Sequence, residues 1–401
     1  MKDALIAFAV AGTEERSVPR VTDWSALLDA TGTHGLIPLA NRALREGDCP
    51  TSVRESFQNH ALGLALRSAQ LLGELGQILT TLAEKGVETI VLKGPALAAS
   101  IYPDPSLRPY RDLDIVCREE DWAVTHQTLL SLGYHSFVRE LPVPTPRVWE
   151  RKAYAHNVYI REDGNVQVEI HFDPWWHDLR PRSGSLIWQH AIPMVLGGAP
   201  TRTLAPEDQL LQLCLHLHRH AYSRAIWFSD LIQLIRTTPT LNWEYLVATA
   251  RHEGFGLSVY YSLAYTEHIF GVAAPASVLV ALRPGPLARW LHQRLWPLDR
   301  LFDRARDEEI PFGFPEVPNA VELLLNLLLT GRHREKLIYL GHLLMPPSEW
   351  LAYYYGTTDP VVLRRRRVVH APKLFLTALS ELTVGVRRGF TVRAAQTLPP
   401  F

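Results

Sequence analysis

Residues 92–117 read LKGPALAASIYPDPSLRPYRDLDIVC and combine a glycine turn with a pair of aspartates. The β-branched run just upstream, residues 87–92, lies between two glycines and predicts a buried strand. We expect Gly94 to make the turn after this strand and Pro95 to occupy the first helical position. A helix that begins here offers backbone N–H groups to a phosphate, and Lys93 adds a positive charge.

The second half of this stretch places two carboxylates on one strand. Residues 113–117 are patterned as a strand, and side chains alternate along strands, so Asp112 and Asp114 point to the same face. Two carboxylates this close raise each other's pKa unless a cation lies between them. Mg²⁺ is commonly held by one or two carboxylates together with substrate phosphates. The pair therefore predicts a site for Mg²⁺ or Mn²⁺.

A third carboxylate is expected from a later hairpin. Residues 153–161 and 165–172 are patterned as strands around Asp163-Gly164, a strong hairpin signal. If the second of these strands pairs beside the aspartates, Glu169 joins them and His171 faces the same way, whereas a slip of one residue would turn both away. Three carboxylates supply the minimum for an in-line displacement with two metal ions.

Together these residues resemble the nucleotidyltransferase superfamily, which has the DNA-polymerase-β-like fold. Within it, the chain looks like a bacterial family of uncharacterised nucleotidyltransferases. The resemblance covers roughly residues 30–235. The motifs that carry it are Leu92-Lys93-Gly94, Tyr102-Pro103, Arg108 to Asp114, Glu169-Ile170-His171, and a helical segment with His216, His220, Trp227 and Asp230. The superfamily has Gly-Ser or Gly-Gly at the turn, where this chain has Gly94-Pro95.

The resemblance implies a metal-dependent enzyme that transfers a nucleoside monophosphate from an NTP, such as ATP. The acceptor would be a hydroxyl or phosphate of a small molecule or a peptide. The implied catalytic and metal-binding residues are Asp112, Asp114 and Glu169, with Glu169 helping to deprotonate the acceptor. The implied nucleotide-binding residues are Lys93, Gly94, Arg108 and His171. Residues that would face the substrate cleft are His216, His220, Trp227 and Asp230.

Several of these residues also have a structural interpretation. Arg108 is placed either to bind phosphate or to neutralise the aspartates when metal is absent. His171 either touches phosphate or packs in the core, and Trp227 is either a core residue or a platform for stacking. His216 and His220 share one helix face, which leaves a phosphohydrolase with a transition metal as a further hypothesis. Another hypothesis is a catalytically inactive nucleotide- or partner-binding protein with the same fold.

The pattern along the chain predicts an α+β fold, with a small mixed-sheet core flanked by N- and C-terminal helical regions. We expect a helical region over 1–85, an α/β core over 86–200, a helical domain that closes the cleft over 201–345, and a basic segment over 346–401. A third strand is expected over 134–140. Helices are expected over 53–85, 119–132, 206–217, 226–235, 245–252, 256–270, 320–344 and 373–386.

The composition restricts the location and partners of the protein. Lys and Arg number 41, as do Asp and Glu, and this balance argues against a nucleic-acid acceptor. The three cysteines form no CxxC pair, which argues against a disulfide framework or a zinc ribbon. No apolar stretch reaches the length of a transmembrane helix and the N-terminus lacks a secretory pattern, so we expect a cytoplasmic protein. Arg364 to Arg367 predict a solvated patch, the alternative being a surface for a phosphate-rich partner or a membrane.

Overall fold

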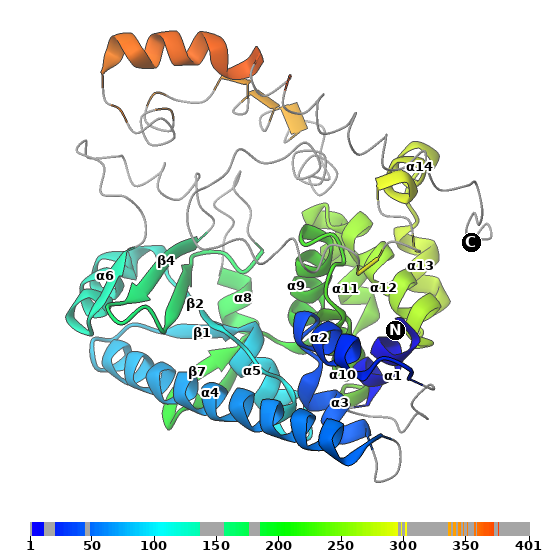
Figure 1. Cartoon of the computed structure of the whole chain (residues 1–401). Coiled ribbons are helices and arrows are strands. Elements are labelled where there is room, and N and C mark those ends of the chain that lie inside the picture. The colour runs from blue at the N-terminus through cyan, green and yellow to red at the C-terminus, as the bar shows by residue number, and fades with distance from the viewer. Residues whose placement is uncertain are drawn as a thin grey trace. The chain divides into compact units, whose positions relative to one another are not determined.

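The computed structural model describes residues 2–11, 21–44, 49–136, 156–175 and 185–295, with residues 298, 301–302 and scattered positions between 336 and 376. The chain divides into two compact units, residues 1–140 with 150–311 and residues 141–149 with 312–401. The sheet and all labelled helices belong to the first unit (Figure 1). In the second unit, residues 360–372 are helical and include the exposed Arg364, Arg365 and Arg366.

One mixed sheet of seven strands forms the α/β part of the first unit, in the order β3-β4-β5-β2-β1-β7-β6. The strands are β1 Thr89–Leu92, β2 Asp112–Cys117, β3 Tyr134–Ser136, β4 His156–Arg161, β5 Gln167–His171, β6 Ile192–Leu196 and β7 Ala199–Thr203. Strand β2 pairs antiparallel with β1 and parallel with β5. The α+β class expected from the sequence is confirmed.

The hairpin expected around Asp163-Gly164 is present and joins β4 to β5. The two strands pair antiparallel, with Val158 opposite Glu169 and His156 opposite His171. Gly164 has φ +72°, a backbone conformation that glycine adopts without the cost of a Cβ clash. The turn therefore fixes the register of β5 against β4, and β5 pairs on its other side with β2, where Glu169 lies opposite Asp114.

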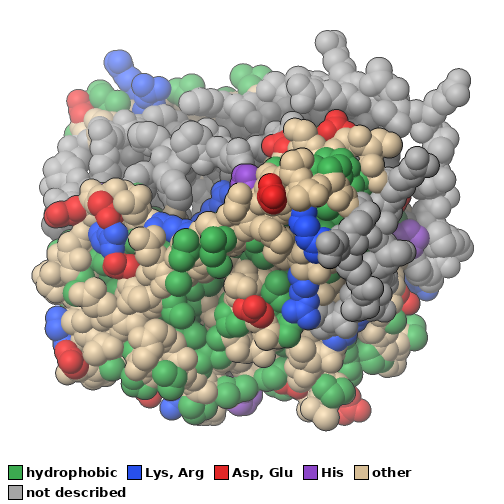
Figure 2. Space-filling view, turned by 60° about the horizontal axis from the view of Figure 1, so that its bottom comes forward, with side chains coloured by type: hydrophobic (Ala, Val, Ile, Leu, Met, Phe, Trp, Pro, Cys, Tyr) green, Lys and Arg blue, Asp and Glu red, His purple; other side chains and the backbone are tan. Residues whose placement is uncertain are grey.

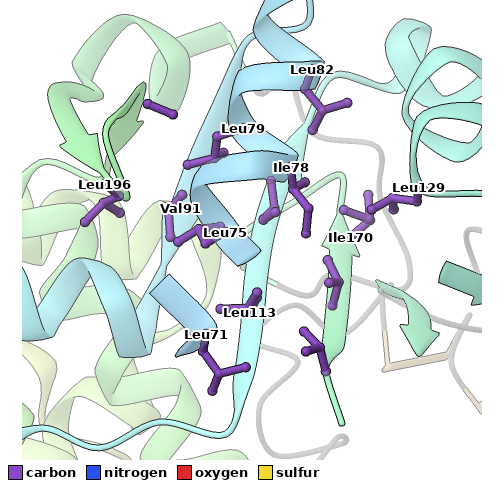
Figure 3. Packing of buried hydrophobic residues seen from close by; sticks show 14 of the residues in the cluster. Leu71, Leu75, Ile78, Leu79, Leu82, Val91, Leu113, Leu129, Ile170 and Leu196 are labelled. Carbon is purple, nitrogen blue, oxygen red and sulfur yellow. The ribbon is translucent and has the colours of Figure 1, made fainter. Parts of the chain in front are cut away.

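Helix α4 (Thr51–Glu84) covers one face of the sheet. Its leucines at positions 71, 75, 79 and 82 recur at three- and four-residue spacing, so they form one apolar stripe. In Figure 3 this stripe packs onto Val91, Leu113 and Ile170 from three adjacent strands. These side chains are almost completely buried, and together they form the main core under the site.

The opposite face of the sheet is divided between a small apolar cluster and polar side chains. Ile90, Leu92 and Val116 pack there with Trp188 of α8 (Ser185–His190). Further helices near the sheet are α5 (Lys93–Ser100) and α6 (Trp122–Ser131), and short 3₁₀ turns occur at Pro105–Leu107 and Glu119–Asp121. The site residues lie beside the apolar cluster, on the face that α4 does not cover.

The rest of the first unit is helical. Its N-terminal helix packs with the helices that follow the sheet in the sequence. Helix α1 (Lys2–Val10) packs against α10 (Ala225–Thr237) and α12 (Gly256–Phe270), and Phe8, Ala9 and Val10 are completely buried (Figure 1). The other helices are α2 Trp24–Thr33, α3 Ile37–Ala43, α9 Pro206–Arg219, α11 Trp243–Glu253, α13 Ala276–Leu282 and α14 Pro286–Leu295.

Most helices expected from periodicity are found within one or two residues of their expected ends. The helices expected over 320–344 and 373–386 fall mainly outside the described residues, as does the end of the strand expected over 134–140. Among the helices of the described part, none has the length and apolar character needed to cross a membrane. On the face shown in Figure 2, acidic, basic and hydrophobic side chains of the described residues are interspersed.

Helix α4 touches the β6–β7 turn through two glycines. A Cβ added to Gly76 would lie 2.2 Å from the carbonyl oxygen of Gly197, a backbone atom that cannot rotate away. Replacing Gly76 by alanine is therefore expected to destabilise the protein by about 1–3 kcal/mol, as overpacking does. Thermal denaturation followed by circular dichroism measures this loss as a lower midpoint temperature.

Gly73 of the same helix provides the matched control. A Cβ there meets no atom within 4 Å, so Gly73→Ala is expected to raise stability by up to about 1 kcal/mol through helix propensity. Equal midpoint temperatures for the two alanine variants would contradict the close packing of α4 on the turn.

Candidate active site

Three adjacent strands bring the predicted site residues together on one face of the sheet. Asp114 lies opposite Leu92 on β1 and opposite Glu169 on β5. Because side chains alternate along each strand, alternate positions of β2 and β5 share this face. They are Asp112, Asp114, Gln167, Glu169 and His171.

Lys93, rather than Gly94, makes the turn at the end of β1. Its φ is +48°, an uncommon conformation for a residue with a Cβ, while Gly94 has a negative φ. The turn directs the Lys93 ammonium back to Asp114, and Nζ lies 2.8 Å from Oδ1. The expectation that Gly94 makes the turn was therefore wrong, because the residue with the positive φ is Lys93.

Gly94 is instead required by close packing. A Cβ there would lie 2.5 Å from Cβ of Tyr110, in the segment that leads into β2. Helix α5 begins at Lys93, so Pro95 occupies the third helical position and not the first. Pro95 has no N–H, so the free backbone donors at this helix start are those of the residues before it.

The buried Asp114 is the centre of the polar contacts. Its Oδ1 accepts hydrogen bonds from Lys93 Nζ and from His171 Nε2, each at 2.8 Å. Its Oδ2 is also buried and has no hydrogen-bond partner. A buried acceptor without a partner costs about 1–3 kcal/mol, so this oxygen calls for a further ligand.

Glu169 is held in place by its neighbour two residues earlier. Gln167 Nε2 donates to Glu169 Oε1 at 2.7 Å, and Oε2 lies 3.7 Å from His171 Nε2. One donor atom from each of Asp114, Glu169 and His171 lies within 4.8 Å of the others. Among the described residues this is the one such group of three, and Asp112, at the edge of β2, is outside it.

The three carboxyl groups at the site differ in how readily they ionise. Burial and the charge of Asp114 raise the pKa of Glu169 to about 8, and the same two causes raise the pKa of Asp112. Burial also opposes ionisation of Asp114, but Lys93 and His171 outweigh it and hold the pKa of Asp114 well below its usual range. Lys93 pairs with Asp114, and Asp112 and Glu169 add two further ionisable carboxylates on the same face, a donor set that fits a divalent cation.

Arg108 pairs with the helical part of the unit rather than with the aspartates of β2. Its Nε and Nη2 donate to the two carboxylate oxygens of Asp230 on α10, at 2.7 and 2.8 Å. Tyr102 donates to the same carboxylate at 2.8 Å, and all three residues are buried. The geometry thus gives Arg108 a structural ion pair with Asp230, a partner that the sequence did not indicate, in place of Asp112 and Asp114.

His216, His220 and Trp227 form one aromatic cluster. Their ring centroids are 4.5–4.9 Å apart in each pair. Burial lowers the pKa of His216 well below its usual range, and the charges of His220, Lys93 and Arg108 lower it further.

Two residues of these networks were missed by sequence reasoning. Gln167 could have been found, because it lies two residues before Glu169 and so shares its face. Tyr102 was noticed only as part of a motif. Its contact with Asp230 joins residues 128 positions apart, for which local patterning gives no signal.

The mixed α+β architecture, with its seven-stranded sheet, is consistent with a nucleotidyltransferase-like fold. The chain belongs to the uncharacterised nucleotidyltransferase family, whose sequence model matches residues 20–271, more than half of the chain. This family indicates an enzyme of the nucleotidyltransferase kind, a class that generally uses an NTP and a divalent metal.

Other comparisons add little. No curated protein matches the chain. The crystal structure of an antigenic nucleotidyltransferase-like protein from Paracoccidioides brasiliensis is similar at 15% identity and a TM-score of 0.32, over 54% of this chain and 94% of that chain.

Proposed function

We propose that the protein transfers a nucleoside monophosphate from an NTP, with ATP the first donor to test, to a hydroxyl or phosphate oxygen of a small molecule or peptide. The acceptor oxygen forms a bond to the α-phosphorus and loses its proton. The bond from that phosphorus to the leaving oxygen breaks and releases pyrophosphate. The observation that carries this proposal is the buried Asp114, with Glu169 beside it and one carboxylate oxygen unsatisfied.

The residues at the site fit a divalent cation and have distinct parts in the reaction. Asp114 and Glu169 would hold it, with Asp112 at the outer edge for a second ion. When bound, the metal supplies activation of the attacking oxygen and charge stabilisation of the leaving phosphate. Glu169 would also help to deprotonate the acceptor, since a carboxylate beside the reacting atoms can act as a general base.

Lys93 would have a part in binding the nucleotide. Its ammonium lies at the end of β1 and forms an ion pair with Asp114 in the absence of nucleotide. Moving the same ammonium to the β- or γ-phosphate would place positive charge where pyrophosphate leaves. His216, His220 and Trp227, which form one aromatic cluster, would line the acceptor side.

The test uses ATP labelled at the α-phosphate, with Mn²⁺ or Mg²⁺ and a low-molecular-weight extract as the source of acceptors. We expect label in a new product and one pyrophosphate released for each label transferred. The other three NTPs are compared in parallel. Water serves as a slow acceptor, so AMP with pyrophosphate is expected even without extract.

A catalytically inactive nucleotide-binding protein gives a different outcome in the same experiment. Nucleotide would bind in the presence of Mn²⁺, but no pyrophosphate would form with any extract or NTP. This result would falsify the proposed transfer.

A further inference from the structure

We infer that Asp114, Glu169 and His171 together form a mixed nitrogen and oxygen site that prefers a divalent transition-metal ion to Mg²⁺. This inference rests on the proposed function, which requires a cation at these strands, and it makes His171 a ligand instead of a nucleotide-binding residue. Asp112 remains at the outer edge of the site.

The spacing of the donor atoms fits one ion. His171 Nε2 lies 2.8 Å from Oδ1 of Asp114, the oxygen that also accepts from Lys93, and 3.7 Å from Oε2 of Glu169. One donor atom from each of the three residues lies within 4.8 Å of the others. Ligands at about 2.1 Å from an octahedral ion lie roughly 3 Å apart when adjacent and roughly 4.2 Å apart when opposite. The observed separations fall in or near this range.

Neighbouring residues hold two of the three ligands. Gln167 binds one oxygen of Glu169 and leaves the other on the side of His171, while Lys93 binds one oxygen of Asp114. The second oxygen of Asp114 is buried and has no hydrogen-bond partner. Such supporting contacts are usual around metal ligands, because they fix ligand orientation before the ion binds.

His171 has the position that a metal ligand needs. It is completely buried on β5, two residues after Glu169 on the same face, and its Nε2 lies close to the carboxylates of both Asp114 and Glu169. Ligation through Nε2 uses the tautomer with the proton on Nδ1, so the bond to Asp114 Oδ1 is exchanged for a bond to the ion. Imidazole favours transition metals, whereas Mg²⁺ favours oxygen ligands alone.

The experiment loads the full chain with Mn²⁺ alone, without nucleotide, and records electron spin echo modulation. We expect the ¹⁴N modulation of a directly coordinated imidazole. The modulation should disappear in His171→Gln, and Mn²⁺ affinity should fall by about tenfold or more while Mg²⁺ affinity changes little. His60→Gln, at an exposed position of α4, is the matched control and should keep the modulation.

The wild-type spectrum keeps the inference testable even if His171→Gln does not fold. Bound Mn²⁺ without ¹⁴N modulation, modulation that persists in folded His171→Gln, or no binding of Mn²⁺ at all would each overturn it. Mn²⁺ bound by oxygen alone would leave the proposed transfer intact. Conversely, ¹⁴N modulation in a protein that releases no pyrophosphate would contradict only the proposed transfer.

Discussion

Replacing Asp114 by asparagine is expected to slow nucleotidyl transfer by about a thousandfold or more. Several kcal/mol of charge stabilisation depend on the ion that this carboxylate would hold, and each 1.4 kcal/mol corresponds to about tenfold in rate. Asparagine keeps the size of the side chain and removes its charge. The measurement is pyrophosphate release from labelled ATP, together with the affinity for Mn²⁺.

The surroundings of Asp114 add a second effect that must be separated from the first. Lys93 would lose its ionised partner in a largely buried position, so the variant should also melt at a lower temperature. Activity is therefore compared at a temperature at which circular dichroism shows both proteins folded. Asp3→Asn, at an exposed position of α1, is the matched control and should retain full activity. Transfer at the wild-type rate in Asp114→Asn would refute the assignment of this site.

Replacing Asp230 by asparagine is expected to destabilise the protein by about 3–5 kcal/mol. The change leaves the buried guanidinium of Arg108 without its bidentate partner, and an uncompensated buried charge costs this much. The midpoint of thermal unfolding should fall by about 10 °C, because 1 kcal/mol shifts the midpoint of a large domain by roughly 2–4 °C.

Glu88→Gln is the matched control for the pair, because Glu88 also binds an arginine but does so at the surface. It lies 3.0 Å from Arg118, with about half of its side chain exposed, and exposed pairs contribute at most about 1 kcal/mol. If Asp230→Asn instead keeps the wild-type midpoint and weakens nucleotide binding, Arg108 serves the nucleotide and not the packing of α10.

The sequence predicts the elements of the site better than its contacts. The hairpin around Gly164 and the alternation along β2 are local patterns, and both are present. The pairing of β5 beside β2, which brings Glu169 opposite Asp114, is a long-range contact that the sequence predicts only conditionally. The same alternation places His171 on that face. His171, and not Asp112, lies within reach of both Asp114 and Glu169. This grouping depends on the register between β5 and β2, which the sequence does not specify.

Contacts between distant parts of the chain could not be predicted. Arg108 and Asp230 are 122 residues apart, and the sequence offered the nearer aspartates as partners. The positive φ of Lys93 was also missed, because glycine is the usual residue for that conformation and Gly94 stands next to it. Both errors arise where packing across the fold outweighs local preference.

The position of α1 has a consequence for synthesis on the ribosome. Its buried residues Phe8, Ala9 and Val10 pack against α10 and α12, which begin at Ala225 and Gly256. At about 5–20 residues per second, roughly 10–50 s pass between the emergence of α1 and that of its partners. During that interval the residues of α1 that pack on these two helices remain without them in the nascent chain.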